Sequence, residues 1–173
     1  MANRIIYVFI LLQLFMSLSC NNVFEDERFT LVKSPNGSNI LRLNGYYYNL
    51  DDSGVGVLFF YRNGVWIDGG WSESLENVEE RIKDGSFYTM LTKRKYSWGL
   101  YLIDDSNIIQ EQLAPTGGLS MIAESTYGDI LNDSTIHYFK QKYSRSKGTI
   151  TIDITYHFKE FAPKPDSINS FIH

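Results

Sequence analysis

Residues 58–67 read LFFYRNGVWI, two apolar stretches joined by Asn63 and Gly64. Asn-Gly readily supplies the two positive φ angles of a type I′ turn, so this stretch predicts a β-hairpin. It is the strongest local indication of an antiparallel sheet in the chain. A two-residue loop would bring two pairs of residues opposite each other: Arg62 with Val65, and Tyr61 with Trp66.

Outward from this hairpin, stretches rich in Tyr, Phe, Ile and Thr alternate with short clusters of Asn, Asp, Gly, Ser and Pro. These clusters favour turns, and the stretches between them favour strands. Strands are predicted near residues 29–33, 39–49, 55–62, 65–71, 87–93, 97–103, 108–113, 120–131, 135–143 and 149–161.

One helix is predicted, over residues 74–83. Ser74 is a good N-cap, Val78 and Ile82 share a face with Leu75, and Gly85 can end the helix in the left-handed conformation.

The last predicted strand shows the clearest alternation, because every second residue from Ile150 to Phe158 is apolar. This period of two predicts one face toward a core. The fold class is therefore all-β with one short helix, arranged as an antiparallel up-and-down barrel; a two-sheet β-sandwich is the alternative. Closure favours the barrel because it leaves no edge strand exposed.

The N-terminus has the three parts of a secretory signal. Arg4 supplies a positive charge, residues 5–16 are apolar except for Gln13, and small or apolar residues precede Cys20. At about 1.5 Å per residue, a helix over the apolar run is too short to span a bilayer. The segment therefore predicts export.

Residues 17–20, SLSC, contain the only cysteine of the 173 residues. This stretch resembles the lipobox of bacterial lipoproteins, in the looser form of the Bacteroidota. The resemblance implies cleavage before Cys20 and attachment of fatty acids such as palmitate to its thiol. The expected organisation is a signal peptide over 1–19, the lipidated cysteine and a flexible tether over 20–28, and one barrel domain over 29–173.

Three further stretches carry a resemblance that spans most of residues 39–173: LRLNGYY at 41–47, WGLY at 98–101 and PDSINSFI at 165–172. Together they resemble a loose group of uncharacterised Bacteroidota lipoproteins with lipocalin-like, or calycin-like, barrels. The resemblance implies that fold and a lipid-anchored place in the outer membrane, on its periplasmic or its surface face. It implies no catalytic residues and no cofactor.

The net charge of −4 is spread along the chain without a basic stripe, which argues against nucleic acid as a partner. No metal site is predicted, since the spacing of His137, His157 and His173 matches no ligand motif. The paired carboxylates fall in turns or on the helix and predict no catalytic site: Asp51 with Asp52, Asp104 with Asp105, and Glu79 with Glu80.

Aromatic residues make up 15% of the chain, and most are expected to pack in a core. Tyr and Trp also stack on sugars and line apolar pockets. The candidate ligand-binding residues are Trp66, Trp71, Trp98 and Tyr101, with Trp71 placed at a cavity mouth.

Three functional hypotheses follow from the sequence. The first is a lipid-anchored binding or interaction module for a small apolar molecule, a glycan or a partner protein. The second is a hydrolase that uses carboxylates near the barrel mouth, although the chain is expected not to be an enzyme. The third is a structural or inhibitor-like lipoprotein with a filled barrel. The interior distinguishes them, because a carrier needs a cavity of roughly 300 Å³ or more.

Overall fold

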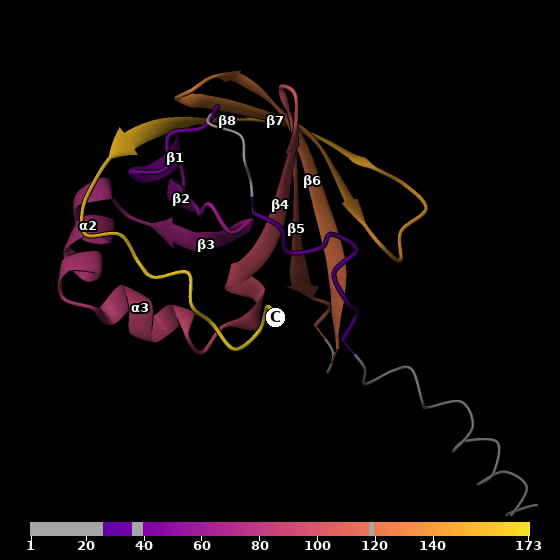
Figure 1. Ribbon diagram of the computed structural model, residues 1–173, viewed down its shortest axis with the longest axis horizontal. Coiled ribbons are helices and arrows are strands. Elements are labelled where there is room, and N and C mark those ends of the chain that lie inside the picture. The colour runs from indigo at the N-terminus through magenta and orange to yellow at the C-terminus, as the bar shows by residue number, and fades with distance from the viewer. Residues whose placement is uncertain (1–25, 36–39, 118–119) are drawn as a thin grey trace, which may run out of the picture.

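Eight antiparallel strands follow one another around a closed barrel in a computed structural model that describes residues 26–35, 40–117 and 120–173 (Figure 1). Two short helices and one 3₁₀ turn are inserted between the third and fourth strands. The elements are β1 (Gly45–Asp51), β2 (Gly54–Phe60), β3 (Val65–Ser72), α2 (Leu75–Lys83), α3 (Ser86–Leu91), η1 (Lys95–Ser97), β4 (Trp98–Asp104), β5 (Asn107–Pro115), β6 (Met121–Asn132), β7 (Thr135–Tyr143) and β8 (Ile150–Glu160).

The barrel closes where β1 pairs with β8, with Tyr47 opposite Phe158. Each remaining strand pairs with its neighbours in sequence, so the up-and-down barrel is confirmed over the sandwich alternative. The turns between consecutive strands lie alternately at the two ends of the barrel. The open end is the one that contains the β1–β2 turn and the start of β6. The closed end is the opposite one, which contains the β2–β3 turn.

Two of the predicted strands are wrong. Residues 87–93 lie largely in α3, where Phe87 and Leu91, four residues apart, are both buried on one helical face. Residues 29–33 form no strand, because the backbone N–H groups of Thr30 and Leu31 donate to the Glu111 carboxylate, at 2.7 and 2.8 Å. Of these two stretches, only Phe87 and Leu91 are fully buried, whereas Val32 is 82% exposed.

The predicted helix over 74–83 is confirmed as α2. The Ser74 hydroxyl accepts a hydrogen bond from the Asn77 N–H at 3.2 Å, and Val78 and Ile82 are buried. Gly85 lies between the two helices at φ +79° and is the N-cap residue of α3. Its left-handed conformation redirects the chain from α2 into α3.

The β2–β3 hairpin forms, but the predicted pairing is wrong by one residue. The Tyr61 N–H donates to the Val65 carbonyl, and Phe60 lies opposite Trp66. The Gly64 N–H donates to the Tyr61 carbonyl, and Gly64 has φ +78°. The connection is therefore a three-residue loop with a left-handed glycine at its end, not a two-residue type I′ turn.

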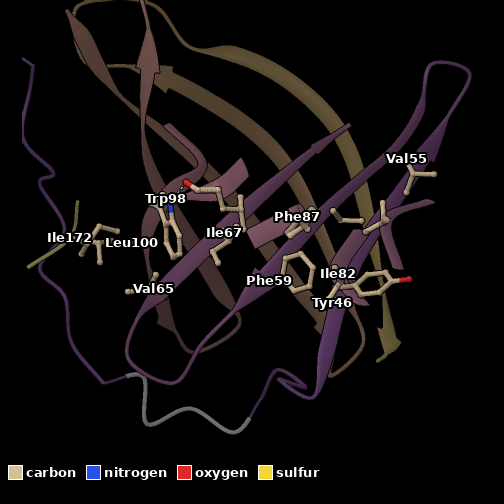
Figure 2. Packing of buried hydrophobic residues seen from close by; sticks show 13 residues of the cluster. Tyr46, Val55, Phe59, Val65, Ile67, Ile82, Phe87, Trp98, Leu100 and Ile172 are labelled. Atoms are coloured by element: carbon tan, nitrogen blue, oxygen red, sulfur yellow. Dashed lines mark hydrogen bonds between the residues drawn. The ribbon is translucent and has the colours of Figure 1, made fainter. Parts of the chain in front are cut away.

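The wall formed by β1 to β4 is buried on both faces. An outer core lies between this wall and a cover of α2, α3 and the C-terminal segment. Figure 2 shows it from close by, with Phe87 beside Phe59 and with Ile67 between these rings and Trp98. An inner core fills the barrel toward its closed end. The buried residues of the inner core are Leu41, Tyr47, Leu58, Phe60, Trp66, Tyr101, Ile108, Ile130, Ile136 and Tyr138.

The C-terminal segment after β8 runs past α2 and α3 (yellow in Figure 1) and is tied to the barrel. The Lys164 ammonium donates to the carbonyls of Leu43, at 2.9 Å, and Phe60. Burial lowers its pKa to about 8. Ile172 then packs in the outer core near Leu100 (Figure 2).

We predict that Gly99→Ala destabilises the barrel by about 1–3 kcal/mol, because it overfills a packed contact. A β-carbon at Gly99 would lie 2.3 Å from the Trp66 Nε1 atom and 2.3 Å from the Glu111 carbonyl oxygen. Urea denaturation measures the change. Gly148→Ala is the matched control, since its β-carbon would be 3.9 Å from the nearest atom. Equal stability of the two variants would contradict the prediction.

Candidate functional site inside the barrel

A cavity of about 160 Å³ lies inside the barrel between the inner core and the open end. Its polar lining comes mainly from β5, β6 and β7. Along β5, Gln110 and Gln112 follow Ile108 at every second position, so all three face inward, while Glu111 faces outward to Thr30. The lining residues with polar side chains include Asp68, Gln110, Gln112, Glu124, Thr126, Tyr138, Gln141 and Tyr156.

Glu124 is the centre of the hydrogen bonds in this lining. Its side chain is buried, and its Oε1 atom accepts from the Gln112 and Gln141 amides, at 3.2 and 2.5 Å. The three residues come from β6, β5 and β7. The carboxylate therefore holds three neighbouring strands in a fixed arrangement around the cavity.

Asp68 is the second carboxyl group of the cavity. Its Oδ1 atom accepts a hydrogen bond from the Gly70 N–H at 2.8 Å. The side chain is half-buried, and it contributes to the lining of the cavity. Burial raises its pKa above the usual range for an aspartate, and the nearby charge of Glu124 acts in the same direction. Burial therefore favours the protonated form of Asp68.

Three buried polar atoms of the lining have no hydrogen-bond partner: Gln110 Nε2, Gln112 Oε1 and the Tyr138 hydroxyl. Gln110 is 3% exposed and Tyr138 is 2% exposed. Leaving such groups unpaired costs free energy, typically about 1–3 kcal/mol each. A ligand with complementary donors and acceptors would recover that cost.

The chain resembles no known protein family, curated protein or solved structure closely enough to be matched. A function for the barrel must therefore be inferred from the residues that line it.

Two of the four candidate ligand-binding residues lie at the cavity. Trp71 is 56% exposed at the open end, and Trp66 is buried deeper, where its indole N–H is shared between the carbonyls of Leu100 and Glu111. The other two lie elsewhere. Trp98 packs in the outer core and donates to the Leu91 carbonyl, and Tyr101 lies in the inner core.

The residues that sequence reasoning missed are the polar ones on β5 to β7. Gln110, Gln112 and Glu124 were assigned no role, because polar side chains in a strand usually face solvent. The alternation of Gln110 and Gln112 with Ile108 along β5 is the one signal that places these two glutamines inside. The paired carboxylates lie outside the cavity lining: Asp51 caps its own turn through Ser53, and Glu79 binds Tyr46 and Lys159.

Two larger hollows lie outside the barrel, where the C-terminal segment crosses α3. They measure about 330 and 350 Å³ and share Tyr88 in their linings. The three unpartnered buried polar atoms in the described part of the chain all line the interior cavity instead. The interior cavity is therefore the better candidate site.

Residues 26–35, 40–117 and 120–173 lack two features. None of the helices there combines the length and apolar character needed to cross a membrane. Within the same ranges, no three His, Cys, Asp or Glu side chains are grouped to hold a metal ion. His137 contacts Asp153 at 2.9 Å.

The raised pKa of Asp68 predicts a pH-dependent effect of Asp68→Asn. Above the unfolded-state pKa of 3.8, the unfolded chain loses this proton before the folded protein does. The wild type should therefore lose stability relative to the variant as pH rises through the folded-state pKa. Urea denaturation between about pH 4 and pH 8 measures the difference.

The control for this titration is Asp51→Asn. Hydrogen bonds from Ser53 lower the pKa of Asp51, so its contribution to stability is present at neutral pH and lost as pH falls. Relative to the wild type, Asp68→Asn should gain stability as pH rises, whereas Asp51→Asn should gain stability as pH falls. A difference between wild type and Asp68→Asn that stays flat with pH would refute the raised pKa.

Proposed function

We propose that this protein is a lipid-anchored lipoprotein of the bacterial cell envelope whose barrel binds a small polar ligand. The observation that carries the proposal is the polar half of the barrel interior, where buried Gln110 and Tyr138 leave polar atoms unpartnered. A barrel that only had to be filled would be more stable with apolar residues at these positions.

The size and polarity of the cavity favour a glycan terminus or a similar small polar group over a large apolar molecule. At about 160 Å³ the cavity is below the roughly 300–1,000 Å³ of most pockets for drug-sized ligands. It has room for about five waters at roughly 30 Å³ each. Trp71, exposed at the open end, offers a ring face on which a sugar can stack.

The lipid anchor is proposed from the signal-like N-terminus and Cys20, both of which lie outside the described residues. The start of the described chain is fixed to the open end of the barrel. The Glu27 N–H donates to the Met121 carbonyl at 3.0 Å, and the Asp26 carboxylate accepts from the Met121 N–H at 2.9 Å. With six residue steps from Cys20 to Asp26, the anchor can lie no farther than about 20 Å from Asp26.

A carboxylate-dependent hydrolase is the second candidate function. The observation that favours it is the different environments of Asp68 and Glu124 in one cavity, with the pKa of Asp68 raised as in a general acid. Binding is the simpler reading, because the Gln112 and Gln141 amides already occupy an oxygen of Glu124.

We expect the wild type, but not Cys20→Ser, to incorporate a clickable palmitate analogue when the full-length gene is expressed in bacteria. The serine hydroxyl is a poor substitute for the thiol in acyl transfer, so the variant should carry no label. In-gel fluorescence of the immunoprecipitated protein provides the readout. Label on the serine variant, or no label on the wild type, would refute the anchor.

We expect the detergent-extracted protein to bind at least one member of a panel of small polar molecules in calorimetry. The panel contains glucose, galactose, N-acetylglucosamine, ethanolamine and choline. Trp71→Ala should weaken this binding about three- to tenfold through loss of the ring face. Leu131→Ala is the control, since Leu131 is 60% exposed toward the closed end. No binding across the panel would instead support a structural lipoprotein.

A further inference from the structure

We infer that the interior cavity binds a small organic cation, with its ammonium group between the carboxyl groups of Asp68 and Glu124 and the surrounding aromatic rings. This inference rests on the proposed binding function and narrows it to one chemical class. The structure supports it through three properties of the lining: its charge, its rings and its unpartnered polar atoms.

The charge of the lining is unbalanced. Asp68 and Glu124 both contribute carboxyl groups, whereas the described lining residues include no Lys, Arg or His. Buried carboxylates are normally paired, because removing a charge from water is costly without a partner. Glu124 receives two amide N–H groups, and Asp68 receives a backbone N–H. A ligand that brings a positive charge would complete both sites.

Aromatic rings surround the same space. Trp71 and Tyr156 both lie close to Gly56, where an added β-carbon would be 3.6 Å from the Trp71 ring and 3.4 Å from the Tyr156 hydroxyl. Tyr138 contacts Tyr156 edge to face, with 5.7 Å between ring centroids, and Trp66 lies deeper in the lining. Rings grouped in this way attract cations through the negative charge of their faces, as in recognition of quaternary ammonium groups.

The unpartnered atoms define the rest of the ligand. Gln112 Oε1 can accept an N–H or O–H donor, whereas Gln110 Nε2 requires an acceptor. An ammonium group alone has no acceptor, so the ligand should also carry a hydroxyl or similar oxygen. Small amino alcohols meet both requirements and are compatible with the cavity of about 160 Å³.

The test compares choline with 3,3-dimethyl-1-butanol, its uncharged isostere with carbon in place of nitrogen. Calorimetry on the full-length, detergent-extracted protein should show choline binding, with the alcohol at least about tenfold weaker. Ethanolamine is measured alongside them. Equal binding of choline and the alcohol would show that charge is not recognised, and would overturn the inference while leaving the binding function intact.

Variants locate the binding. Glu124→Gln and Asp68→Asn should each weaken choline binding at least about tenfold, because each removes one carboxyl group. Asp153→Asn makes the same change on β8 at a side chain that is 93% exposed, and should leave binding unchanged. Thermal unfolding identifies any variant that has not folded. Where one carboxyl variant does not fold, the other still decides the result.

The remaining outcomes separate the two proposals. Binding of a neutral sugar without binding of choline or ethanolamine would overturn the cation inference and retain the proposed function. Choline binding that both folded carboxyl variants preserve would place the ligand outside the cavity, and would also overturn the inference. Failure of every compound in the panel would overturn both.

Discussion

Pairing of β1 with β8 is the constraint on which the rest of the structure depends. Once the sheet is closed, every second side chain of each strand is committed to an interior of limited volume. Apolar and aromatic residues fill that interior toward the closed end, and Asp68, Gln110 and Glu124 line it toward the open end. Strand register therefore decides which part of the interior is apolar and which part is polar.

The outer face of β1 to β4 carries a second core. Helices α2 and α3 and the C-terminal segment cover β1 to β4, so that Phe59, Ile67 and Trp98 are buried outside the barrel. On the inner face, Trp66 links β3 to the next two strands, since its indole N–H donates to carbonyls on β4 and β5. The described residues contain no cysteine, so the two cores stabilise this part of the chain without disulfides.

Residue patterns predicted the barrel and α2 but not every backbone conformation. The alternation in β8 and the spacing of Val78 and Ile82 depend on local periodicity, which the sequence displays directly. Residues 87–93 were misassigned because Phe and Tyr favour strands, whereas burial at Phe87 and Leu91 follows a helical period. The polar cavity was missed because the side of the sheet that a glutamine faces is decided by register with other strands, as for Gln110.

Among the described residues, the packed inner core fills one end of the barrel interior. Tyr47, Phe60 and Tyr101 stack edge to face at the closed end, with 5.5 Å between the first two ring centroids and 5.0 Å between the last two. A ligand of the kind proposed above would therefore enter and leave at the end where Trp71 lies. An interior arranged in this way suits temporary storage of a molecule, or its transfer to an acceptor at the entrance, better than passage of a solute through the barrel.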